Sequence, residues 1–172
     1  MFDVQKSLEM IEGFKTHYNY DTAYMEEMLK ISPASYEVFE AFLPMATFVN
    51  KAPVDVINIA RITAIKNEDC GTCVQLYVDL AIEAGLDKEV AREIIFNKGE
   101  SLSLDLKLVY DFTLAVSNNE TIDANVSDRM NQTYSREVMM EISLAIAATK
   151  VFPTIKRVLN YMQSCSVIQI KV

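Results

Sequence analysis

The sequence predicts a single, all-α domain, and three observations support this prediction. Apolar residues recur at intervals of about three to four along most of the chain, which is the spacing of one helix face. Only four Gly and four Pro occur in 172 residues, so long regular elements are expected. The composition, with 51% hydrophobic and 23% charged residues, is that of a globular protein, and no low-complexity tract or charge run marks a linker.

Helices are predicted from the first residues onward. Helical spacing of apolar residues predicts two helices in this region. The apolar face of the first consists of Val4, Leu8, Ile11 and Phe14, and that of the second of Tyr24, Met25, Met28 and Leu29. Ser32 and Pro33 begin a third helix, because the serine oxygen accepts a free amide and proline has no amide to leave unpaired. Pro44 lies inside this third pattern and is expected to kink or end it.

Two more helices are predicted on either side of a polar break at residues 66–69. The segment after Pro53 has apolar residues in helical register, and a second helix is expected over residues 70–84. Gly85 is expected to end that helix, since glycine enters the left-handed backbone region without steric cost. Asp87 then caps another helix.

The C-terminal half contains one ambiguous segment. Leucines alternate between residues 102 and 108, which is a strand signal, but the pattern from Val109 onward is helical and an isolated strand would have no partner. We therefore expect a helix there. Asp123 and Ser135 are the expected caps of two further helices, and the β-prone residues 165–172 are expected to form an extended arm. In total about eight to ten helices are expected.

Charge and hydropathy exclude several classes of function. Sixteen Lys and Arg against 24 Asp and Glu give a net charge of −8, which disfavours binding to nucleic acid or to anionic lipid. The longest uncharged stretch, residues 158–170, is shorter than the roughly 20 residues of a membrane-spanning helix. The first residues contain early acidic side chains and no apolar signal segment. A cytoplasmic protein without a membrane partner is expected.

Two of the three cysteines form a CxxC motif, Cys70-Gly71-Thr72-Cys73. A structural zinc site would need four ligands, and the chain has no second CxxC or Cys/His pair. The odd cysteine count and the missing signal disfavour a secreted disulfide framework. Two readings remain: a pair of buried structural cysteines, or a redox dithiol.

Local physical chemistry favours the dithiol. With Asp69 as the expected N-cap, Cys70 would be the first helical residue, where free amides and the helix dipole stabilise a thiolate. A separation of three residues places both sulfur atoms on one helix face. The carboxylates of Glu68 and Asp69 oppose this effect, because nearby negative charge destabilises a thiolate.

The residues around this motif resemble the alkylhydroperoxidase D-like, or carboxymuconolactone decarboxylase, family. The resemblance runs through INIARITAIKNEDCGTCVQLYVDLAIEAGLDKEVAREII and adds YSREVMMEISLAIAATKVFPTIKRVL in the second half. It implies an all-α core over residues 36–164 with a pseudo-repeat, preceded by a helical extension, residues 1–35, and followed by the arm. It also implies a homo-oligomer, either a trimer or a hexamer, and no cofactor or metal.

The family's redox members imply specific roles. Cys73 would be the attacking thiol and Cys70 the resolving thiol, although general dithiol logic favours the more exposed Cys70 as the nucleophile. A glutamate and a histidine relay the proton in these members, but their positions here are Asn58 and Tyr77, which cannot act as ordinary bases near neutral pH.

Three features are alternatives to the missing relay: Glu68, Glu141 and the helix dipole. Spacing alone does not show that any of them replaces it, and a solvated acid in a turn is the simpler interpretation of Glu68. The one histidine, His17, lies among polar residues outside the resembling region and is expected on the surface. Asn58, Tyr77 and Glu68 are therefore candidates for pocket or relay residues only.

Three functions follow as hypotheses. The first is a thiol-dependent peroxidase or disulfide oxidoreductase, acting on a small hydroperoxide or disulfide and re-reduced by an external dithiol. Its activity would be reduced because both relay residues are replaced. The second is a non-redox enzyme like the family's decarboxylases, which would not need the cysteines. The third is a catalytically degenerate member that acts as a binding or scaffold module.

Overall fold

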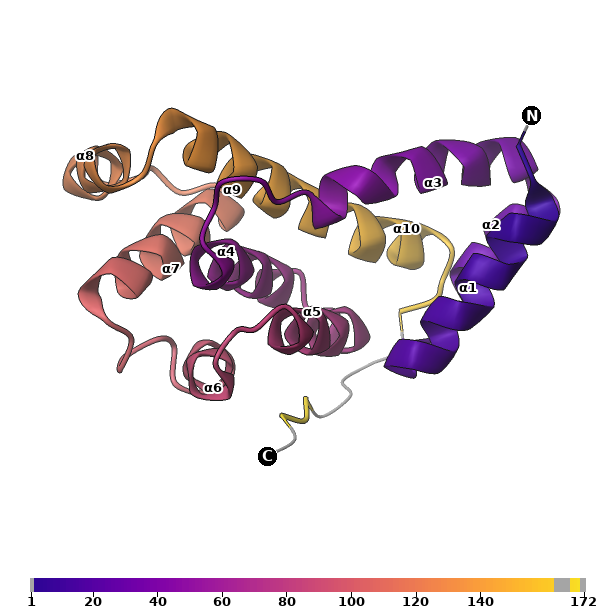
Figure 1. Ribbon diagram of the computed structural model, residues 1–172, viewed down its shortest axis with the longest axis horizontal. Helices are drawn as coiled ribbons and strands as arrows, with labels where there is room; N and C mark the ends of the chain where they lie inside the picture. The colour runs from indigo at the N-terminus through magenta and orange to yellow at the C-terminus, as the bar shows by residue number, and fades with distance from the viewer. Residues whose placement is uncertain (1, 163–167, 171–172) are drawn as a thin grey trace.

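Every regular element in the described part of the chain is a helix. The structure is a computed structural model that describes residues 2–162 and 168–170 (Figure 1). Its helical segments are α1 (Val4–Tyr18), α2 (Ala23–Ile31), α3 (Pro33–Thr47), α4 (Val54–Asn67), α5 (Gly71–Glu83), α6 (Lys88–Phe96), α7 (Leu104–Ser117), α8 (Ala124–Thr133), α9 (Arg136–Thr149) and α10 (Val151–Val158). Only Lys150 separates α9 from α10. The predicted all-α class is confirmed.

Most of the predicted helix boundaries are confirmed by their caps. The Ser32 side chain accepts from the Ser35 amide at the start of α3, and Asp87 accepts from Glu89 at the start of α6. Asp123 and Ser135 cap α8 and α9 in the same way. Gly85, with a φ of +99°, follows the end of α5. Of the alternating leucines, those at 104, 106 and 108 form the start of α7, and Leu102 precedes the helix.

Pro44 does not end α3, which continues to Thr47. Proline removes one backbone hydrogen bond and crowds the preceding turn, which is why the sequence predicts a kink or an end at this position. Pro44 lies only one turn before the end of the helix, and buried Phe39 and Ala46 hold α3 against its neighbours on both sides of it. Tertiary packing therefore outweighs the local penalty.

The larger hydrophobic core surrounds α4. Ile57, Ile59 and Ile62 point in different directions around this helix, yet each is at most 1% exposed. Helices α5, α6, α7 and α9 pack against α4 and enclose it. A helix buried on all sides has apolar residues on every face, which explains why α4 lacks a clear polar stripe.

A second, aromatic core lies at the other end of the molecule, where α1, α2 and α3 meet. Its buried centre includes Tyr24, Tyr36 and Phe39. Phe152 of α10 packs against both cores, and its ring lies edge-on to Phe39, with the centroids 6.0 Å apart. Figure 1 shows α10 continuing the line of α9 toward the N-terminal helices. Residue 35, the expected end of the extension, falls within α3.

Glu141 joins α9 to the segment between α3 and α4. Its carboxylate is 4% exposed and accepts three backbone amides, from Asn50, Lys51 and Ala52, at 2.9, 2.8 and 3.0 Å. Burial alone would raise the pKa of Glu141, but these hydrogen bonds outweigh it and the pKa is lowered. Both oxygens are thus committed to a structural role.

One described segment, Arg136–Val158, is long and apolar enough to cross a membrane by length and composition. This segment is distinct from the uncharged stretch 158–170, which is too short to span a membrane. A core helix of a globular protein has the same composition, and a little under half of the apolar window is buried within the chain. The cytoplasmic location remains a prediction.

We predict that Glu141→Gln lowers the free energy of unfolding by about 2–4 kcal/mol at neutral pH, because an amide nitrogen would face backbone donors. The folded-state pKa of Glu141 lies below 4.5, so its carboxylate stabilises the fold above that pH and loses this effect as the pH falls through the folded-state pKa. Urea unfolding over a series of acidic pH values measures both effects.

Glu137→Gln is the matched control, since Glu137 is an exposed glutamate on the same helix. Replacing the Glu137 carboxylate should lower the free energy of unfolding by less than about 1 kcal/mol. A difference between wild type and Glu141→Gln that stays constant as the medium becomes acidic would contradict the assignment.

Candidate functional site

The CxxC motif lies at the turn between α4 and α5. Asp69 adopts a left-handed backbone conformation, with a φ of +52°, which aspartate tolerates better than most residues. This turn makes Cys70 the N-cap of α5, and the helix itself begins at Gly71. The expectation that Asp69 is the cap and Cys70 the first helical residue is therefore wrong by one position. The left-handed residue redirects the chain and moves the helix start forward.

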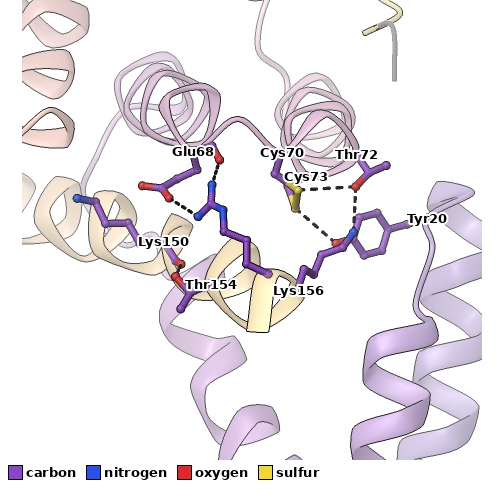
Figure 2. Close-up of a disulfide and its surroundings, with 9 residues drawn as sticks. Tyr20, Glu68, Cys70, Thr72, Cys73, Lys150, Thr154 and Lys156 are labelled. Carbon is purple, nitrogen blue, oxygen red and sulfur yellow. Dashed lines mark hydrogen bonds and ion pairs between the residues drawn. A yellow bond between two sulfur atoms is a disulfide. The ribbon is translucent and has the colours of Figure 1, made fainter. Parts of the chain in front are cut away.

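The two sulfur atoms lie at disulfide-bonding distance, and the Cα atoms of Cys70 and Cys73 are 5.3 Å apart (Figure 2). Cys70 is 2% exposed and Cys73 is 1% exposed. The pair is therefore enclosed by other side chains. A large partner cannot reach either sulfur without movement of the residues that cover them.

Lys156 of α10 and Tyr20, from the segment between α1 and α2, cover the pair. The Lys156 ammonium donates to the Thr72 hydroxyl at 2.9 Å, and Thr72 Oγ1 lies 3.8 Å from Cys70 Sγ. The Tyr20 hydroxyl lies 3.8 Å from Cys73 Sγ. Figure 2 shows these contacts as a chain of dashed lines around the yellow sulfur atoms.

Lys156 is itself almost fully enclosed, with 1% of its surface exposed. Its ammonium lies 4.9 Å from the centre of the Tyr20 ring and 5.5 Å from that of Tyr24. Burial lowers the pKa of Lys156, and the charge of Asp21 opposes this shift. Burial also raises the pKa of Tyr20 to about 12. The tyrosines are thus neutral near neutral pH, and their rings stabilise the ammonium by cation–π attraction.

Glu68 lies beside the motif but is engaged elsewhere. Its carboxylate accepts from Arg157 of α10 at 3.1 Å, and its backbone carbonyl accepts a second hydrogen bond from the same guanidinium. Among the described residues, no hydrogen bond joins the Glu68 carboxylate to either sulfur. The arrangement neutralises one of the two negative charges expected to oppose a thiolate.

The structure does not bring Asn58 or Tyr77 into hydrogen-bond contact with the cysteines, as far as the chain is described. The Asn58 amide donates to the Val54 carbonyl at 2.9 Å within α4. Tyr77 is buried with its ring 6.4 Å from that of Phe152, and burial raises its pKa above 10. Glu141 is held by backbone amides, as described above, so it does not supply the missing relay.

Tyr77 instead lines an apolar cavity of about 180 Å³ between α1, α2, α3, α5 and α10. Its walls consist of these side chains: Met10, Ile11, Phe14, Tyr24, Met25, Tyr36, Leu43, Ala46, Thr47, Leu76, Tyr77, Leu80 and Phe152. Tyr24 is shared between this cavity and the cage around Lys156. Neither cysteine lines this cavity, and a role of Tyr77 as a pocket or relay residue of the cysteine pair stays a prediction.

The remaining candidates lie away from the pair or outside the description. His17 is exposed and contacts the Glu83 carboxylate at 3.3 Å, at the far end of α5, about 18 Å along the helix from the motif. No group of three or more His, Cys, Asp or Glu side chains in residues 2–162 and 168–170 could hold a metal ion. Cys165 and most of the expected arm lie outside the described residues.

Sequence reasoning missed Lys156, Thr72 and Tyr20. One signal was present: Phe152 and Lys156 are one turn apart and share a face of α10, so a lysine occupies a position where an apolar side chain is expected. The contacts with Thr72 and Tyr20 depend on tertiary packing and have no local signature.

Comparison of the chain with family models, with curated proteins and with solved structures gives no match.

We predict that Asp69→Ala lowers stability by about 1 kcal/mol more than Asp69→Gly, because only glycine adopts the positive φ at position 69 without steric cost. Both variants remove the same carboxylate, so the difference between them reports on the backbone alone. Thermal and urea unfolding measure it. Equal stabilities would show that the turn before Cys70 does not require the left-handed conformation.

Proposed function

We propose that Cys70 and Cys73 form a redox-active pair, and that the protein is a thiol-dependent peroxidase or disulfide oxidoreductase similar to the alkylhydroperoxidase D-like proteins. The observation that supports it best is the placement of two sulfur atoms at bonding distance at the start of a helix, beside a buried ammonium. The helix start and the ammonium each stabilise a thiolate, which is the reactive form of cysteine.

The proposed reaction balances without a metal or cofactor. In the reduced protein, one thiol ionises and its thiolate attacks the terminal oxygen of a hydroperoxide; the O–O bond breaks, a sulfenic acid forms, and the leaving alkoxide takes up the proton that the thiol released and becomes an alcohol. The second thiol then attacks the sulfenic sulfur, water leaves, and the disulfide forms. An external dithiol gives two electrons and two protons to regenerate the pair and becomes a disulfide itself.

Burial of the pair defines the substrates that fit. Because both sulfur atoms are at most 2% exposed, a small oxidant is favoured over a folded protein as the direct partner. The absence of a base at Asn58 and Tyr77 is expected to slow the peroxide step by roughly 10²–10⁴-fold relative to a site with a positioned base. Thiol–disulfide exchange depends less on such a base and is expected to be retained.

The same burial favours one alternative, a structural disulfide in a binding or scaffold module. Enclosed cysteines are often inert. In that case the apolar cavity beside Tyr77 would be the functional feature. The decarboxylase-like alternative requires no cysteine and would survive replacement of both.

We also propose a homo-oligomer, a trimer or hexamer. Large apolar side chains that are more than half exposed occur on several helices: Ile31, Val38, Phe96, Leu104, Met140 and Val158. Met139 packs into the core while its neighbour Met140 faces outward. Sedimentation at micromolar concentration should show an assembly, and a monomer there would contradict this proposal.

We predict that the reduced Cys165→Ser protein, exposed to one equivalent of an organic hydroperoxide at neutral pH, converts to the Cys70–Cys73 disulfide. Intact mass over time measures the loss of two hydrogen atoms, that is, two protons and two electrons, and replacement of either remaining cysteine by Ser should prevent intramolecular disulfide formation.

The Tyr77→Phe variant in the same background is the control for the relay position. It should react within about 2-fold of its parent, because the Tyr77 hydroxyl makes no described contact with either sulfur. Thiols that resist both hydroperoxide and small disulfides in the folded protein would exclude the redox function and favour the structural alternative.

A further inference from the structure

We propose that Lys156 acts through Thr72 to stabilise the thiolate of Cys70, so that Cys70 is the more acidic thiol of the reduced pair. This inference deepens the proposed redox function, but thiol acidity is measurable without turnover and is therefore testable on its own. It also differs from what the resemblance implies, namely that Cys73 is the attacking thiol.

Lys156 carries a charge for which the described residues provide no close counter-ion. No carboxylate in that part of the chain lies within ion-pair distance of its ammonium. An ammonium has three hydrogen-bond donors, and among the described residues Lys156 uses one of them, to Thr72. Burial of a cation without a paired anion is unfavourable in free energy, so a negative charge that forms close to Lys156 is stabilised by its ammonium.

Thr72 connects this cation to one sulfur in particular. Its hydroxyl oxygen accepts from Lys156, which leaves the hydroxyl proton free to point toward Cys70 Sγ, 3.8 Å away. A hydroxyl that accepts from a cation becomes a stronger donor, because the two hydrogen bonds polarise each other. A thiolate at Cys70 would thus receive a polarised hydrogen bond from Thr72.

The start of α5 adds to the effect on the same sulfur. Cys70 is the N-cap of α5; its sulfur makes no cap hydrogen bond in the structure, but it lies at the positive end of the helix dipole, which favours a thiolate there. Cys73 lies inside the first turn, and its sulfur contacts the neutral hydroxyl of Tyr20, whose pKa is raised to about 12 by burial. The cationic contribution therefore falls on Cys70 and a neutral hydrogen bond on Cys73.

Several charged groups oppose or modify this effect. Asp69 adjoins Cys70 in the sequence, and Asp21 interacts with Lys156 from the segment before α2. Glu68 lies on the other side of the turn, but Arg157 pairs with it. Tyr20 and Tyr24 stay neutral at the pH of interest. A measured thiol pKa includes all of these contributions, so variants must isolate the part due to Lys156.

The test uses proteins with a single cysteine. Cys73→Ser/Cys165→Ser retains only Cys70, and Cys70→Ser/Cys165→Ser retains only Cys73. The rate of alkylation by iodoacetamide, followed by intact mass across a pH series, gives the pKa of each thiol. We expect the pKa of Cys70 to lie below that of Cys73. Lys156→Met should raise the pKa of Cys70 by about one unit and change that of Cys73 by less than half as much.

Lys156→Met keeps the length and apolar stem of the side chain, and circular dichroism shows whether each variant is folded. Thr72→Val removes the bridging hydroxyl at nearly constant shape and should raise the pKa of Cys70 by part of the amount that Lys156→Met does. Thr72→Ser keeps a hydroxyl at this position and should leave the pKa of Cys70 at its wild-type value. Should Lys156→Met fail to fold, the Thr72 pair tests the same connection.

Lys150→Met is the matched control for net charge. Lys150 lies just before α10, and its ammonium donates toward the Ser117 carbonyl at 3.5 Å, away from the cysteines (Figure 2). This variant should leave both thiol pKa values unchanged.

The proposal is overturned if Lys156→Met and Lys150→Met have the same effect on Cys70, if both thiols shift equally, or if Thr72→Val is silent. These outcomes are independent of peroxidase activity. A shifted Cys70 without any response to hydroperoxide would support the inference and contradict the proposed peroxidase function.

Discussion

The buried ammonium of Lys156 joins three separate parts of the chain beside the cysteine pair. Its own helix, α10, continues from α9, and its contacts reach Tyr20 and Tyr24 near the N-terminus and Thr72 in α5. An enclosed cation must be compensated by oriented dipoles, π-faces or an anion, or it loses its proton. The tyrosine rings and the Thr72 hydroxyl supply that compensation. The N-terminal helices therefore form part of the candidate site as well as packing against the rest of the fold.

This arrangement assigns different chemistry to the two halves of the site. The resemblance places the proton relay on α4 and α5, but Asn58 is bonded within α4 and Tyr77 lines an apolar cavity beside Phe152. The polar contacts with the sulfur atoms come instead from Tyr20 and from Thr72, which Lys156 holds. In the proposed function, a positive charge on α10 takes over part of the task that the redox members assign to histidine and glutamate.

The sequence was sufficient for features that depend on neighbouring residues. Ser32 and Asp87 have side chains whose local chemistry favours a helix start, and Gly85 has the backbone freedom that a helix end requires. The CxxC spacing likewise indicated two neighbouring sulfur atoms at a helix start, and the structure has them at disulfide-bonding distance although Cys70 lies just before the helix. Pro44 shows the limit of such reasoning, because packing on both sides of it keeps α3 intact. Asp69 shows another, since a single left-handed residue moved the cap to Cys70. Lys156 and Thr72 are 84 positions apart, and only the tertiary structure brings them together.

The most direct test of the central claim is a redox titration of the folded Cys165→Ser protein in glutathione buffers, with the two states of the pair resolved by intact mass. A redox-active pair should interconvert reversibly while the protein stays folded, with a midpoint above about −300 mV. A pair that remains oxidised below that potential, and opens only when the protein unfolds, would identify a structural disulfide and contradict the account.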